Sequence, residues 1–183
     1  IQETDDEFTW IVAQIPFAPQ VVRDYPEVEK STRLFNMGRT LFRYGEEEHN
    51  EELVYYADST FFDIFSYKLL DGALEGSFDR PNTIVLTESM SERYFGNEGP
   101  IGKSLQSGDD LYTVTTVIGD VPENSHILFD GLVSRNTMPD EVGSWGQFGV
   151  FTYLLLQEGT DASFLQEKMK SMYDNYMASI FEP

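Results

Sequence analysis

The sequence predicts an α+β fold, a mixture of short strands and helices without a regular βαβ repeat. Apolar and polar residues alternate over residues 111–121, which is typical of a strand, and apolar residues recur at helical spacing over residues 161–180. Gly and Pro end most elements after a few residues, and no internal repeat or low-complexity linker is visible. We therefore expect many short elements that share a core.

Length and charge narrow the class of protein. A chain of 183 residues fits one domain, 1–183, or two small lobes that share a core. With 12 basic and 32 acidic residues the net charge is −20, which opposes binding to nucleic acid and to anionic lipid. Cysteine is absent, which excludes disulfides, thiolate catalysis and thiolate metal sites.

The ends of the sequence lead to a further expectation. The chain begins at Ile1 without a charged and then apolar leader. It also holds no apolar run near the roughly 18 residues that span a bilayer. We therefore expect an excised part of a larger protein.

Prolines mark the first elements. An apolar stretch over residues 8–15 ends at Pro16, and Pro19–Tyr25 predicts a short helix that Pro26 stops.

Strand-like segments follow over residues 28–43. Glu52–Ala57 is expected to pair with Thr40–Tyr44. Between them the polar sequence GEEEHNEE, residues 45–52, predicts a hairpin loop in which Gly45 supplies the turn geometry.

The middle of the chain predicts a helix, a strand and a second helix. Apolar residues over 61–70 recur at helical spacing, and Gly72 stands where a helix often ends. Thr83–Leu86 predicts a buried strand, after which Thr87 caps a helix that ends at Gly96.

Further strands are expected over residues 111–121, 127–133 and 148–157. In the first of these, one face is expected to carry Tyr112, Val114, Thr116 and Ile118.

The last element is predicted as a helix capped by Asp161. Its wide apolar face is expected to pack in the core rather than to form a groove for a partner, and consists of Phe164, Leu165, Met169, Met172, Tyr173, Tyr176, Met177 and Ile180.

A phosphate-binding loop is the first candidate site. Gly96–Ser104 reads GNEGPIGKS and ends in Gly-Lys-Ser, but the motif requires Gly where Asn97 stands. The segment also follows a helix, and Pro100 lacks an amide that phosphate would need. The residues favour a helix end and a turn into the next strand.

The two histidines are the next candidates. His49 lies among carboxylates, but without the oxygen spacing of a calcium loop, so a solvated acidic turn is favoured. Ser125 and His126 are neighbours and point to opposite faces if the segment is extended, so they do not form a catalytic pair with Asp130. The acidic pairs Asp5–Asp6 and Asp109–Asp110 show no spacing typical of an acid and a base. We expect no catalytic, cofactor-binding or metal-binding residue.

Trp145, with Phe148 and Phe151 nearby, has two readings. It could form an exposed aromatic contact surface, or it could fill the core from a Gly-rich turn.

Three blocks of the sequence resemble one known family. They are PEVEKSTRLF at residues 26–35, DSTFFDIFSYKLLDG at residues 58–72 and PNTIVLTESMSERYFGNEGPIGK at residues 81–103, which continues through residues 114–130. Their order and spacing are similar to the MacB-like periplasmic core domain of FtsX/MacB-type ABC transporter permeases, especially in forms typical of Bacteroidetes.

The resemblance implies two α/β lobes, a porter-like lobe built from both ends of the segment and an inserted Sabre-like lobe. It also implies a non-enzymatic periplasmic domain of an inner-membrane permease, without a cofactor, that couples cytoplasmic ATP hydrolysis to export or to the handling of a periplasmic substrate. Its implied partners are the permease's own transmembrane helices, an ATP-binding subunit, a second permease protomer and a periplasmic adaptor or lipoprotein.

Two other classes stay open from the residues themselves. A free-standing envelope module would contact a peptide or polymer through Trp145. An acidic hydrolase would need a deep pocket that holds a perturbed carboxylate or histidine.

Overall fold

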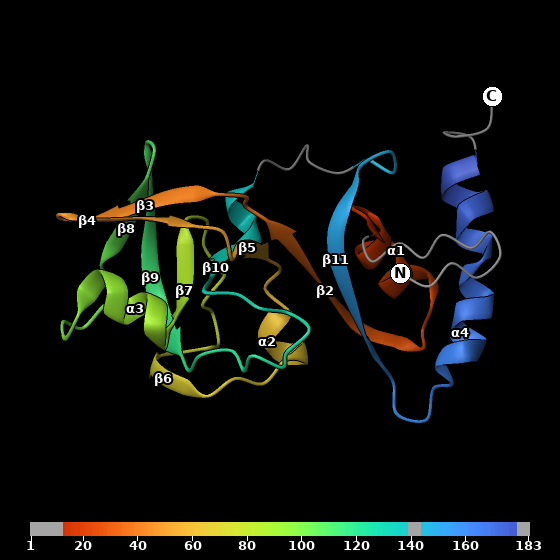
Figure 1. Ribbon diagram of the computed structural model, residues 1–183. Coiled ribbons are helices and arrows are strands. Elements are labelled where there is room, and N and C mark those ends of the chain that lie inside the picture. Colours follow the sequence, from red (N-terminus) through yellow and green to blue (C-terminus); the bar gives the residue numbers. More distant parts are fainter. Residues whose placement is uncertain (1–12, 139–143, 179–183) are drawn as a thin grey trace.

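The computed structural model describes residues 13–138 and 144–178 of the chain (Figure 1). One mixed sheet runs through the molecule, and short helices lie against it, which confirms the predicted α+β class. The strands are β1 (Ala13–Gln14), β2 (Val28–Asn36), β3 (Thr40–Tyr44), β4 (Glu47–Glu51), β5 (Val54–Ala57), β6 (Leu69–Gly72), β7 (Thr83–Thr87), β8 (Ser104–Ser107), β9 (Asp110–Ile118), β10 (Gly131–Ser134) and β11 (Phe148–Leu156). The helical elements are α1 (Phe17–Asp24), α2 (Phe61–Ile64), α3 (Glu88–Phe95), a 3₁₀ turn (Arg135–Thr137), α4 (Ala162–Met169) and a π-helical turn (Tyr173–Met177).

The strands follow the order β1-β11-β2-β5-β10-β7-β9-β8-β3-β4, and β6 pairs with β9 beside this path. The pairs β5–β10 and β7–β9 are parallel, whereas the other pairs are antiparallel. Strands from both ends of the chain, β1, β2 and β11, therefore lie together at one end of the sheet.

Two apolar clusters lie on opposite faces of the middle strands. Ile84 and Leu86 of β7 pack with residues of α3 on one face, whereas Val85 packs with Phe61 of α2 on the other. Because β7 is buried on both faces, it reads as a continuous apolar run rather than an alternating one.

A third cluster joins the two ends of the chain. Val21 and Tyr25 of α1 and the following turn pack with Leu165 of α4 and with Met172. In Figure 1 this group lies on the opposite side of the molecule from β3, β4 and α3. This cluster is thus separate from the two that flank the middle strands.

The short helix before Pro26 is confirmed and begins at Phe17, two residues earlier than expected. The strand predicted before α3 is confirmed as β7. The predicted cap of α3 is also confirmed, because the Thr87 hydroxyl accepts a hydrogen bond from the Met90 amide, and the helix ends at Gly96. The expected apolar stretch over residues 8–15 lies mostly outside the described residues.

The predicted hairpin between residues 40 and 57 is wrong in its pairing. β3 pairs with β4, which consists of residues expected in the loop. The turn between the two strands therefore contains only Gly45 and Glu46 instead of the eight residues expected. β5 instead enters the sheet interior between β2 and β10. Burial explains the exchange, because the apolar β5 suits the centre whereas the polar β4 suits the edge.

The long helix expected over residues 61–70 is also wrong. α2 ends at Ile64, and Gly72 belongs to strand β6 rather than to a helix end. The helical spacing is misleading because the aromatic side chains converge on one buried ring, with Phe65 and Tyr67 both against Phe61. Packing of these rings overrides the local helix pattern.

The expected alternation along β9 holds only as far as a bulge. Tyr112 and Val114 pack in the cluster beside α3, but Ile118 packs in the cluster on the opposite face. The register against β7 shifts between Ile84 and Val85, so Thr115 has no partner in the ladder. One extra residue moves the following side chains to the other face.

The last strands and helix match the prediction in part. Of the expected strand over 127–133, only residues 131–133 lie in a strand, which continues to Ser134, whereas β11 spans nearly the whole predicted segment over 148–157. The Asp161 carboxylate caps α4 by accepting from the amides of Ser163 and Phe164 at 2.8 and 3.3 Å. Phe164 is 60% exposed, so it does not lie in the core as expected.

Other residues of the predicted apolar face do reach the core. Leu165 and Met172 are buried, and Met169 and Tyr176 pack against the same cluster. Ile180 lies outside the described residues. Within residues 13–138 and 144–178, no helix has the length and apolar character that a membrane span requires.

Candidate functional site

The loop that ends in Gly-Lys-Ser serves the fold. The amide of Gly102 donates to Val114 and that of Lys103 donates to Pro100, so these donors are already used. The Lys103 ammonium pairs with Glu98, whose pKa this hydrogen bond lowers, and lies 5.5 Å from the ring centres of Tyr44 and Phe95. These contacts match the predicted helix end and turn into the next strand.

His49 lies on β4 rather than in a loop. Its Nε2 is 3.4 Å from a Glu47 carboxylate oxygen, and its ring meets Tyr94 edge to face. In the described part of the chain, no three His, Asp or Glu residues are grouped so that they could hold a metal ion.

His126 lies in the exposed loop between β9 and β10. Its ring is 5.6 Å from that of Tyr153, while the Ser125 hydroxyl accepts from the Ile127 amide. Ser125 and His126 therefore make separate contacts. Asp109 lies in the turn between β8 and β9 and Asp110 begins β9, and both are exposed. Asp5–Asp6 lies outside the described residues.

Of the two readings of Trp145, the structure favours the core. Its ring stacks on Tyr176 with centres 4.9 Å apart and planes 11° apart. Both rings pack against the cluster that joins α1 to α4. Phe151 likewise packs against an apolar cluster, whereas Phe148 is 51% exposed.

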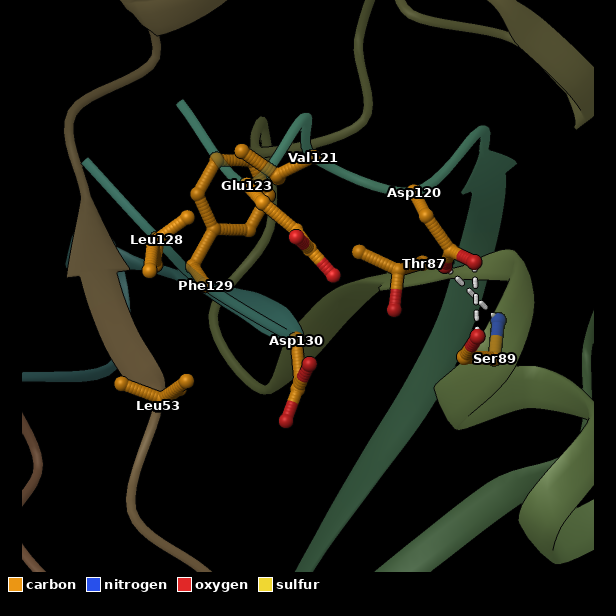
Figure 2. Close-up of a pocket in the computed structure, with 9 residues that line it drawn as sticks. All are labelled: Leu53, Thr87, Ser89, Asp120, Val121, Glu123, Leu128, Phe129 and Asp130. Atoms are coloured by element: carbon orange, nitrogen blue, oxygen red, sulfur yellow. Dashed lines mark hydrogen bonds between the residues drawn. The ribbon is translucent and has the colours of Figure 1, made fainter. Parts of the chain in front are cut away.

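A pocket of about 300 Å³ lies where the loop after β9 meets the start of β10 (Figure 2). We call it the Asp130 pocket. Its lining residues are Leu53, Thr87, Ser89, Asp120, Val121, Glu123, Leu128, Phe129 and Asp130.

The backbone fixes the position of Asp130 in this pocket. Its amide donates to the Leu53 carbonyl at 2.8 Å, and its carbonyl accepts from the Thr87 amide at 2.9 Å. Burial raises the pKa of its carboxyl; Arg93 lowers that pKa, whereas Glu51 and Asp120 raise it. Burial and three neighbouring charged residues therefore act together on the pKa of Asp130.

The opposite side of the pocket is held by Asp120. Its carboxylate accepts from the Ser89 amide at 2.9 Å and from the Ser89 hydroxyl at 2.6 Å, as the dashed lines of Figure 2 show. These bonds place a negative charge at the first turn of α3, where the helix dipole favours it. Ser89 faces a carboxylate here, not a histidine that could activate it.

A buried charged group lies beside the pocket. The Glu51 side chain is 4% exposed and accepts two bonds of 2.7 Å from Arg93 Nη1 and one of 2.8 Å from the Tyr94 hydroxyl. The hydrogen bond to Glu51 raises the pKa of Arg93. Burial, together with the hydrogen bond to the Glu51 carboxylate, raises the pKa of Tyr94. The ion pair and the hydrogen bonds connect the end of β4 to α3, and the charge of Glu51 is paired with that of Arg93.

A second charged group joins β2 to the residues that directly follow β1 and β5, and we call it the junction. Arg33 donates to both oxygens of Asp58 at 2.7 and 2.8 Å, and to the Ile15 carbonyl at 2.9 Å. Two guanidinium groups lie near the Phe35 ring, those of Arg33 and Arg135, at 5.5 and 5.4 Å from its centre. The junction therefore connects the end of the sheet that holds both chain ends to its middle.

Sequence reasoning missed both charged groups and the pocket. Their members are far apart in the chain, such as Glu51 and Arg93, or Arg33 and Asp58. Neither pair follows a local motif, so only the pairing of strands could have indicated them.

Comparisons with known proteins agree with this fold. The sequence model of the MacB-like periplasmic core domain matches residues 3–172. No curated protein sequence gives a match.

Three solved structures share the fold. A domain of a permease protein from Porphyromonas gingivalis has a TM-score of 0.79 at 22% identity, over 94% of this chain and 82% of that one. The periplasmic region of MacB from Actinobacillus actinomycetemcomitans has a TM-score of 0.70 at 18% identity, over 89% and 73%. The extracellular domain of the noncanonic ABC-type transporter YknZ from Gram-positive bacteria has a TM-score of 0.62 at 16% identity, over 85% and 80%.

The family model spans most of the chain, and the solved structures show the same architecture. The family predicted from the three sequence blocks is thereby confirmed. The chain belongs to the MacB-like periplasmic core domain family of ABC transporter permeases.

Proposed function

We propose that this domain transmits movement without catalysing a reaction. In this proposal, ATP hydrolysis by a cytoplasmic subunit moves the membrane helices of the permease, and the domain carries that movement to a substrate or partner in the periplasm. The family membership supports the proposal most strongly. The partners would be the permease's own helices, an ATP-binding subunit, a second protomer and a periplasmic adaptor or lipoprotein.

The sheet suits this role because it is continuous from the strands of both chain ends to β4. We propose that these ends, with α1, β2, β11 and α4, form one lobe and that the strands between them form the other. The junction would hold the two lobes at a fixed angle. Its partly buried ion pair would resist bending, because the side chains of Arg33 and Asp58 are only 15% and 17% exposed.

Weakening the ion pair of the junction should uncouple ATP hydrolysis from the action of the permease in the periplasm. In the complete permease with its ATP-binding subunit, Asp58→Asn should reduce the periplasmic action several-fold while ATP hydrolysis continues, because the guanidinium loses one charged partner. Transport or release of the substrate and ATP hydrolysis would be measured in the same vesicles.

Lys30→Met is the matched control. It removes the neighbouring ion pair with Asp63, whose partners are 39% and 49% exposed, and it should leave both rates unchanged. Unaltered coupling in a folded Asp58→Asn permease would contradict a role for the junction.

A further inference from the structure

We infer that the Asp130 pocket binds a lysine or arginine side chain that a partner protein presents on an apolar segment. The inference goes beyond the proposed transmission of movement. A basic side chain would bind in the Asp130 pocket of a single chain, without ATP and without a second protomer. It rests on the charge, the walls and the rigidity of the pocket.

The charge of the pocket suits a cation. Asp120, Glu123 and Asp130 line it, and none of its nine lining residues is a lysine or arginine. The nearby Arg93 is already bonded to Glu51 through both carboxylate oxygens. The hydrogen bonds of Arg93 therefore go to Glu51, while its charge still favours the ionised form of Asp130 by lowering the pKa of that carboxyl.

The walls suit the aliphatic part of a basic side chain. Leu53 and Leu128 are 37% and 42% exposed, and Val121 and Phe129 continue the apolar surface. Figure 2 shows the two leucines on the side away from Asp120 and Ser89. Lysine and arginine bury their methylene stems against apolar groups while the charged end meets carboxylates.

The pocket is also organised before any ligand arrives. Hydrogen bonds fix the backbone of Asp130 and the side chain of Asp120, as described above. Among the residues that the structure describes, none donates a hydrogen bond to the Asp130 carboxylate, so its oxygens are available. A bound cation would favour the charged form that burial disfavours.

The size of the pocket and its apolar rim favour a protein segment over a free ion. A volume of about 300 Å³ is at the lower end of pockets that hold small molecules, which suits one side chain. The exposed leucines would then cover the apolar neighbours of that side chain. Charge complementarity with a chain of net charge −20 would guide a basic segment to it.

Nuclear magnetic resonance of the isotope-labelled chain tests the inference, with the tripeptide amide N-acetyl-Leu-Lys-Leu as probe. At about 0.15 M salt, where long-range attraction is screened, the peptide should shift the amide signals of Leu53, Ser89 and Leu128 in a saturable way. The same peptide with norleucine in place of lysine should bind about tenfold more weakly.

Two double variants, each of which removes two negative charges, distinguish binding in the pocket from attraction to the net negative charge of the chain. Glu123→Gln with Asp130→Asn should weaken binding about tenfold. Asp109→Asn with Asp110→Asn, at exposed positions where the β8–β9 turn enters β9, should not weaken it. Unchanged signals outside the pocket would show that the first variant is folded. Equal binding of the norleucine peptide, equal loss in both variants, or no shift at Leu53 and Leu128 would overturn the inference.

Discussion

Gly72→Ala is expected to lower the free energy of unfolding by roughly 3 to 5 kcal/mol, a large part of the stability of a domain. A Cβ at this position would lie 2.3 Å from the Thr115 carbonyl oxygen and 3.0 Å from the Thr116 Cα. Both contacts are with backbone at the bulge of β9, which cannot rotate away. The φ of +79° adds strain for any other residue.

Gly45→Ala is the matched control for this prediction. Its φ is +60°, but no atom lies within 4 Å of the added Cβ, so the loss should be about 1 kcal/mol from backbone strain alone. Urea denaturation followed by tryptophan fluorescence and circular dichroism measures both variants. Equal losses would show that β6 does not lie against the bulge of β9.

Arg93→Met is expected to cost roughly 3 kcal/mol, because it leaves the Glu51 carboxylate buried with only the Tyr94 hydroxyl as a side-chain donor. The value is below the maximum for buried pairs because the Arg93 side chain is 34% exposed. Denaturant unfolding at neutral pH is again the measurement.

A second substitution tests whether the buried charge causes this loss. Adding Glu51→Gln to Arg93→Met should recover part of the stability, since no unpaired charge then remains. Lys170→Met, which breaks a pair in which both partners are 69% exposed, should cost less than about 1 kcal/mol. A double variant less stable than Arg93→Met would contradict the explanation.

The sequence predicted elements well where local chemistry decides them. Thr87 and Asp161 cap their helices as expected, because the hydroxyl or carboxylate lies within reach of amides two or three residues ahead. The loop with Gly-Lys-Ser was interpreted correctly for the same reason, since Asn97 and Pro100 are local features.

The sequence failed where distant residues decide the structure. The exchange of β4 and β5 depends on which strand lies beside β2 and β10, and the fate of Gly72 depends on a bulge over forty residues later. The junction shares this property because Arg33 lies on β2 and Asp58 follows β5. The pocket shares it because Leu53, Thr87 and Ser89 line it together with the loop between β9 and β10. Such contacts leave no periodic pattern in a single sequence.

Cysteine pairs offer the most direct test of the proposed transmission of movement. The chain has no cysteine, so Glu46→Cys and Gln166→Cys would place spin labels on exposed positions of the β3–β4 turn and α4, on opposite sides of the molecule in Figure 1. Distances would be measured in the complete permease with its ATP-binding subunit, with and without ATP.

Labels at one position in both protomers report how the domains move relative to each other, whereas both labels in one protomer report its internal shape. The account predicts that ATP changes the distance between protomers and leaves the distance within a protomer unchanged. An unchanged distance between protomers, or a change confined to the distance within one, would contradict it.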